Sequence, residues 1–160
     1  AFVDMFRHAW RAARGDAPLT RIAIVDDDPD HQFLHPEFVL FEELFRRHGL
    51  TAEIADARAL TVRDGRLRAD GRAIDLAYNR VTDFAFAEDQ HAALRQAWLE
   101  DLAVITPHPH AHALYADKHN LALLTDPEWL AARAKTEENG PIVAKITNSF
   151  LQPTSFSSVK

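Results

Sequence analysis

Cysteine is absent from this sequence. That absence excludes disulfide bonds, thiolate nucleophiles and zinc–thiolate sites. No apolar run is long enough to span a bilayer, and no signal peptide can be recognised. These absences favour the interpretation of a cytoplasmic protein with no membrane partner.

Glycine is scarce, with five in the whole chain. The acidic loop DDDPD over 26–30 follows a short apolar run and contains no glycine. A dinucleotide site needs G-x-G-x-x-G at this point, because glycines let the backbone approach the pyrophosphate. No P-loop, G-x-S-x-G or HExxH motif occurs either. The sequence therefore argues against NAD or FAD binding by this first loop.

Basic residues are outnumbered, with 18 Lys and Arg against 24 Asp and Glu, and the formal net charge is −6. The basic residues are scattered and form no stripe, so no nucleic-acid partner is expected. The hydrophobic fraction of 47% is typical of globular proteins. A chain of 160 residues can bury a substantial core.

Helix-like and strand-like segments alternate along the first 134 residues. Periodic apolar residues and end signals predict helices over 2–13, 36–48, 89–99, 113–124 and 128–134, and strands over 21–25, 50–55, 74–81 and 103–106. Such alternation predicts an α/β fold, a Rossmann-like parallel sheet with helices on both faces. Two Asp-Gly pairs between short alternating runs predict a β-hairpin insertion over about 59–74.

Two regions are expected along the chain. The α/β domain is assigned to 1–134. Residues 135–160 are interpreted as an extension or as the truncated start of a following domain. A strand is possible over 141–146, and the Ser- and Thr-rich end predicts partial mobility.

Polar side chains follow the predicted strands. Asp26 and Asp27 end the first strand, and Asn79 and Arg80 lie near the end of the third. Ligands of parallel sheets bind beyond the carboxyl ends of the strands, so these four residues are predicted to line a substrate crevice. Arg80 could make a bidentate contact to a substrate carboxylate, or an ion pair with an acidic residue such as Asp83. Strand termination and helix capping are the structural alternative.

A phosphoacceptor receiver domain is one alternative function. The run IAIVDDDPD resembles the start of such a domain, and Asp26 and Asp27 could hold Mg²⁺. A receiver also needs an aspartate at the end of its third strand to accept the phosphoryl group. Asn79 occupies that position and has no nucleophilic carboxylate.

A metal-dependent hydrolase is a second alternative. His108, His110 and His112 alternate within PHPHAH. If the segment is extended, alternate residues point the same way, and three imidazoles could bind a divalent metal ion. Exposed histidines on a proline-stiffened loop are the structural alternative, and no metal ligand is assigned.

Three ordered blocks carry a family resemblance. They are IAIVDDDPDHQFLHPEFVLFEELFRRHGL over 22–50, IDLAYNRVTDF over 74–84 and VITPHPHAHALYADKHNLALLTD over 104–126. Together they resemble the pre-ATP-grasp domain of circularly permuted ATP-grasp proteins that are similar to glutathione synthetase and glutathionylspermidine synthase. The resemblance extends over about 2–130.

The resemblance implies a Rossmann-like domain that forms the acceptor-substrate pocket of an ATP-dependent carboxylate–amine ligase. ATP and Mg²⁺ would be held by ATP-grasp domains in cis, and the partner would be a small carboxylate or amine. In that reaction a carboxylate is phosphorylated and an amine then attacks the acyl phosphate. Asp117-Lys118 matches the Asp-Lys pair of the helix that leads to the nucleotide domain, so Lys118 is implied as a phosphate or interdomain contact.

The chain departs from the family pattern after Leu130. The family continues into a glycine-rich, lysine-bearing segment, which here is matched only faintly by IVAKI over 142–146. The ATP site is therefore not expected within this chain. The sequence predicts the substrate-side part of a ligase, incomplete for catalysis alone.

Overall fold

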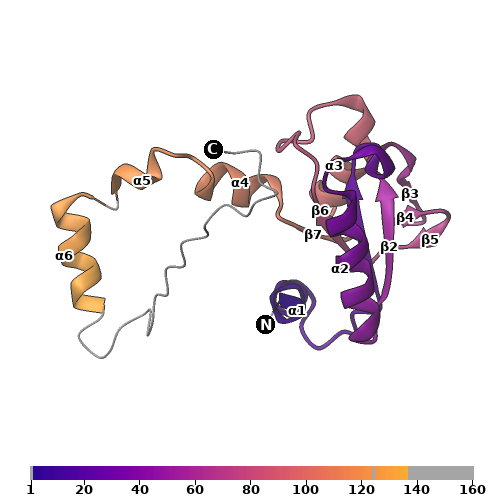
Figure 1. Cartoon of the computed structure of the whole chain (residues 1–160), viewed down its shortest axis with the longest axis horizontal. Coiled ribbons are helices and arrows are strands. Elements are labelled where there is room, and N and C mark those ends of the chain that lie inside the picture. The colour runs from indigo at the N-terminus through magenta and orange to yellow at the C-terminus, as the bar shows by residue number, and fades with distance from the viewer. Residues whose placement is uncertain (1, 124, 137–160) are drawn as a thin grey trace, which may run out of the picture. The chain divides into compact units, whose positions relative to one another are not determined.

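The computed structural model of the chain describes residues 2–123 and 125–136 (Figure 1). The chain divides into two units, Ala1–Asp117 and Lys118–Lys160. This division reflects spatial contacts, and the domain boundary expected at residue 134 stays a prediction. The possible strand over 141–146 lies outside the described residues.

The first unit is built on a parallel four-stranded sheet. Its strands, in the order in which they lie side by side, are β2 (Thr51–Asp56), β1 (Arg21–Asp26), β6 (Leu76–Asn79) and β7 (Val104–Thr106). The predicted α/β fold is confirmed. The chain runs from β1 to β2 on one side and then crosses back to β6 on the other side of β1. The strand order therefore reverses between β1 and β6, which is where such sheets form ligand crevices.

Helices cover both faces of this sheet, as predicted (Figure 1). The helices of the first unit are α1 (Phe2–Arg14), α2 (His35–Arg47), α3 (Ala92–Leu99) and α4 (Pro109–Tyr115), and its short 3₁₀ turns are η1 (Pro29–His31), η2 (Ala57–Ala59) and η3 (Asp89–His91). Helices α1 and α2 pack on the face that carries Ile22 and Ile24. Helix α3 packs on the face that carries Ala23 and Val25.

The α1–α2 face has an aromatic core. Val3, Phe6 and Trp10 are buried, and their spacing of three and four residues places them on one side of α1. The ring of Phe6 packs edge-on against Phe45 and Tyr78, with centroid distances of 5.0 and 4.9 Å. This cluster joins α1, α2 and β6, so it fixes the position of the strand that carries the polar residues at its end.

An inserted antiparallel sheet follows β2. It consists of β3 (Thr61–Arg63), β4 (Arg66–Ala69) and β5 (Arg72–Ala73), so the predicted hairpin is confirmed and has a third short strand. The two Asp-Gly pairs form its turns, with positive φ at all four residues (Asp64 53°, Gly65 66°, Asp70 46°, Gly71 73°). Such turns match the twist of the strands. Leu67 is fully buried in the α3-side core and anchors the insertion.

The structure differs from prediction around residue 110. The sequence predicts one helix over 113–124, whereas α4 begins at Pro109 and ends at Tyr115. Pro109 suits the first helical position, and the Nδ1 atom of His108 accepts the Ala111 N–H at 3.2 Å as a helix cap. In the second unit, α5 (Asn120–Leu123) and α6 (Pro127–Thr136) are separate helices. None of the described helices has the length and apolar character needed to cross a membrane.

Candidate functional site: a cleft at the carboxyl edge of the sheet

The tips of β1 and β6 lie side by side. Val25 is opposite Asn79 in the parallel register, and the backbone N–H of Arg80 donates to the Val25 carbonyl at 2.8 Å. The end of β7 adjoins β6, with Thr106 opposite Tyr78. The ends of the first and third predicted strands therefore meet as expected, and the end of β7 lies beside them.

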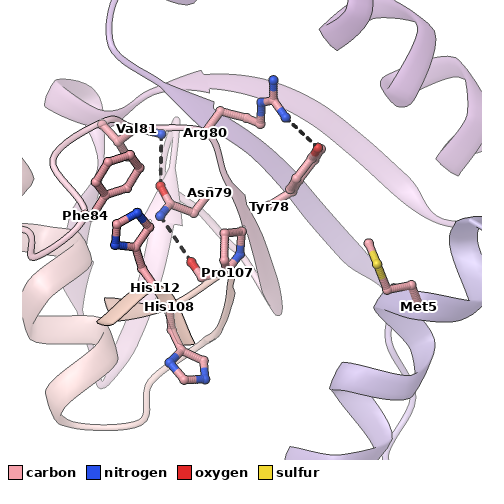
Figure 2. Close-up of a pocket in the computed structure, with 9 residues that line it drawn as sticks. All are labelled: Met5, Tyr78, Asn79, Arg80, Val81, Phe84, Pro107, His108 and His112. Carbon is pink, nitrogen blue, oxygen red and sulfur yellow. Dashed lines mark hydrogen bonds between the residues drawn. The ribbon is translucent and has the colours of Figure 1, made fainter. Parts of the chain in front are cut away.

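A cleft of about 430 Å³ opens at this edge. Its walls come from α1, the end of β6, the following loop and the start of α4; the lining residues are Met5, Tyr78, Asn79, Arg80, Val81, Phe84, Pro107, His108 and His112 (Figure 2). Two of the four predicted substrate-binding residues, Asn79 and Arg80, are among them.

Asn79 is buried, and its amide has protein partners at both ends. Its Nδ2 donates to the Pro107 carbonyl at 3.1 Å, and its Oδ1 accepts the Val81 N–H at 3.1 Å (Figure 2). The side chain therefore ties the segment after β7 to the segment after β6. Asn79 shapes the cleft, and its hydrogen-bonding groups are engaged by the protein.

Arg80 is held in place by three side chains. Its Nη1 donates to the Tyr78 hydroxyl at 2.9 Å, its Nη2 lies 3.5 Å from Glu37 Oε1, and its guanidinium lies 5.8 Å from the centre of the Phe38 ring. Glu37, not Asp83, is the ion-pair partner. The side chain is 24% exposed, so the guanidinium is fixed yet still reaches solvent.

Asp26 and Asp27 lie beside the cleft and are not among its lining residues. Asp26 is buried, and burial raises the pKa of its carboxyl, although its hydrogen bond from the Asp27 N–H and the nearby Arg80 charge oppose the rise. Asp27 takes part in a different contact. Its Oδ1 lies 2.8 Å from Nε2 of His91.

His91 is a residue that the sequence analysis missed. It is completely buried, and its ring lies between two carboxylates: Nε2 contacts Asp27, and Nδ1 lies 2.8 Å from Asp83 Oδ2. The spacing of His91 from Leu94 and Ala97 could have indicated that it is buried. The three residues follow one another at intervals of three, and residues three apart lie on the same side of a helix. We name Asp27, His91 and Asp83 the carboxylate–histidine clamp.

The clamp shifts the titration of its members. Burial alone would lower the pKa of His91, but hydrogen bonds to Asp83 and Asp27 outweigh burial, and the pKa is raised. At Asp83, burial by itself would raise the pKa of the carboxyl group. The Glu88 N–H and the His91 ring overcome that effect and lower the Asp83 pKa from 3.8 to about 2. The imidazolium and the Asp83 carboxylate therefore stabilise each other.

The Asp83 shift predicts a loss of stability in acid. A depressed carboxyl pKa contributes stability above its unfolded value of 3.8, and that contribution disappears as the pH falls toward about 2. We expect Asp83→Asn to flatten the decline of the unfolding free energy between these pH values. Urea unfolding at a series of pH values measures this effect. Asp70→Asn, at an exposed turn carboxylate, is the control and should keep the wild-type slope.

The three histidines of PHPHAH do not all project to one side, because the chain turns into α4 at Pro109 and does not continue as an extended segment. The His112 ring stacks on Phe84 with centroids 3.6 Å apart, His110 packs edge-on against Trp98 at 5.0 Å, and His108 caps α4. Within the described residues, no three His, Asp or Glu side chains are grouped closely enough to hold a metal ion.

Lys118 is the first residue of the second unit and is exposed. Its implied contact with a phosphate or with another domain stays a prediction.

Comparison with known proteins finds no match: no protein-family model matches the chain, and no curated protein matches it.

Proposed function

We propose that this chain provides the substrate-side domain of a cytoplasmic ATP-dependent carboxylate–amine ligase of the ATP-grasp type. The observation that carries the proposal is the Arg80 guanidinium, which is fixed at the carboxyl end of β6 and lines a cleft at the reversal of strand order. A guanidinium recognises a carboxylate through paired N–H donors. The proposed ligand is a small molecule with a carboxylate group.

The contacts of Arg80 leave it able to bind a ligand. An arginine has five N–H donors, and within the described residues the hydrogen bond to Tyr78 and the ion pair with Glu37 use only part of them. These contacts also restrict the side chain before ligand arrives, which lowers the entropy lost on binding. Phe84 and His112 give the same cleft an apolar, aromatic wall for the rest of the ligand.

ATP and Mg²⁺ would be held by ATP-grasp domains in cis. The described residues contain no glycine-rich phosphate loop and no acidic cluster suited to Mg²⁺, so ATP chemistry is assigned to those domains. The role proposed for this chain is to bind and orient the acceptor substrate.

Carboxylate binding is tested by titrating the ¹⁵N-labelled 160-residue chain with L-glutamate, glutathione and spermidine. We expect a carboxylate probe to shift the amide signals of Arg80 and Phe84. Arg80→Met keeps the aliphatic stem but removes the charge, so it should weaken that binding by about tenfold, the effect of one charge-assisted hydrogen bond. Arg63→Met, on the exposed side of the inserted sheet, is the matched control and should leave binding unchanged.

Two outcomes would contradict the ligase proposal. The first is ATP hydrolysis by this chain alone. The second is an acid-labile aspartyl adduct after incubation with acetyl phosphate and Mg²⁺, which would favour the receiver alternative. Asn79 at the phosphoacceptor position weighs against that alternative, because an amide cannot accept a phosphoryl group in this way.

A further inference from the structure

The loop over 81–88 forms one wall of the cleft and is held at several points. The Arg95 guanidinium donates to the Phe86 carbonyl at 2.7 Å and to the Ala87 carbonyl at 3.2 Å. Phe86 is fully buried in the left-handed region, with φ of 52°, a conformation that persists only where the surroundings enforce it. These contacts present Phe84 to the cleft, where its ring stacks on His112.

The clamp connects this loop to the end of β1. Asp83 belongs to the loop and accepts both the Glu88 N–H and a contact from His91, while the other ring nitrogen of His91 reaches Asp27. A neutral imidazole donates from one nitrogen only, whereas an imidazolium donates from both. Both carboxylates can therefore accept a hydrogen bond from His91 only when the ring carries two protons.

We propose that His91 is a positioning residue whose second proton holds the loop over 81–88, and with it Phe84, in place along the cleft. Asp27 is the more exposed of the two carboxylates, with 29% of its side chain exposed against 9% for Asp83. Water can replace the imidazolium more easily at Asp27. Loss of the proton at Nε2 then breaks the tie between the loop and β1.

Other charged groups near His91 include one carboxylate and two guanidiniums. The Asp26 carboxylate interacts with His91 from the end of β1. Arg58 belongs to η2, which packs against η3, and its guanidinium pairs with Asp56 at 2.5 Å and lies 3.7 Å from Asp28. On α3, Arg95 is engaged by loop carbonyls. Arg58 and Arg95 are therefore engaged by other groups. The carboxylates of Asp27 and Asp83 stabilise the positive charge of His91.

The positioning role stands independently of the proposed function, and only its effect on ligand binding rests on that function. Since hydrogen bonds to Asp83 and Asp27 raise the His91 pKa, the imidazolium persists to higher pH than an ordinary imidazolium does, and the clamp is lost as pH rises through the raised value. The wall formed by Phe84 is then released. A carboxylate ligand that packs on Phe84 would bind more weakly above that transition.

Amide hydrogen exchange of the 160-residue chain, corrected for the intrinsic pH dependence, tests the positioning role without any ligand. The Glu88 amide is hydrogen-bonded to Asp83. As His91 loses its proton, we expect the protection of this amide to fall about tenfold, which is the effect of losing one charged hydrogen bond. The ring ¹⁵N shifts of His91 report that proton directly. The Thr51 amide is the internal control, because it donates to the Thr20 carbonyl outside the loop and should keep its protection.

Two variants sharpen the test. Asp27→Asn keeps the shape of the side chain but removes its charge, so the change at Glu88 should move to lower pH. Asp28→Asn alters the adjacent carboxylate, which pairs with His31, and should leave the transition where it is. The proposal is overturned if the Glu88 amide keeps its protection after His91 loses its proton, or if Asp27→Asn behaves like Asp28→Asn.

Titration with glutathione at pH values on both sides of the His91 transition separates the two proposals. If glutathione does not bind while the Glu88 transition is present, the ligand assignment fails and the positioning role stands. If glutathione binds equally well at both pH values and the Glu88 transition is absent, the positioning role fails and the ligand assignment stands.

Discussion

Replacing Phe6 with alanine is expected to lower the free energy of unfolding by about 3–5 kcal/mol, the usual cost of truncating a buried phenylalanine. The Phe6 ring is fully buried and packs edge-on against Phe45 and Tyr78. Alanine would leave a cavity among three elements that cannot all move inward, and two aromatic contacts would be lost.

Urea unfolding followed by circular dichroism measures this change. Phe33→Ala is the matched control, because Phe33 is 94% exposed and its truncation should alter the unfolding free energy by no more than about 0.5 kcal/mol. Similar losses in the two variants would contradict the assignment of Phe6 to the core. So would a loss below about 1 kcal/mol for Phe6→Ala.

The same core supports the cleft. Phe6 contacts the ring of Tyr78, and the hydroxyl of Tyr78 accepts a hydrogen bond from Arg80. The guanidinium is thus oriented by a side chain whose own position depends on α1. Helix α1 lies at the start of the chain, far in sequence from β6. It nevertheless contributes to the geometry of the candidate binding site.

The sheet and its insertion were predictable because their signals are local. The alternation of strands with amphipathic helices identified the parallel sheet, and the two Asp-Gly pairs identified the turns of the inserted strands. The meeting of β1 and β6 at their carboxyl ends also followed, since parallel strands must end at the same edge. Asn79 and Arg80 were placed correctly at that edge for this reason.

The partners of those residues were not predictable from the sequence. Glu37 is on α2, and its contact with Arg80 depends on how that helix packs on the sheet. His91 is separated from Asp27 by 64 positions, and no local pattern joins them. The metal-binding alternative required an extended PHPHAH segment, and that geometry is absent because Pro109 begins a helix that His108 caps.

The clamp leads to the second large expected effect on stability. His91→Phe keeps a ring in the buried position but removes both donors, so Asp83 remains largely buried with its charge no longer paired. Removing one partner from a buried charge pair costs about 3–5 kcal/mol, and we expect a loss at the lower end of that range because Glu88 still donates to Asp83. His31→Ala removes an exposed histidine–aspartate contact and should cost less than about 1 kcal/mol.

A double variant tests whether the unpaired charge causes that loss. Adding Asp83→Asn to His91→Phe removes the stranded charge while its Oδ1 can still accept the Glu88 N–H. The double variant should therefore be more stable than His91→Phe alone at neutral pH, although each substitution by itself destabilises the protein. Additive losses in urea unfolding would instead mean that His91 acts through ring packing alone. Recovery of stability in the double variant would show that the Asp83 charge is tolerated in this core only because the imidazolium of His91 faces it. The position of the loop over 81–88 depends on the same pairing.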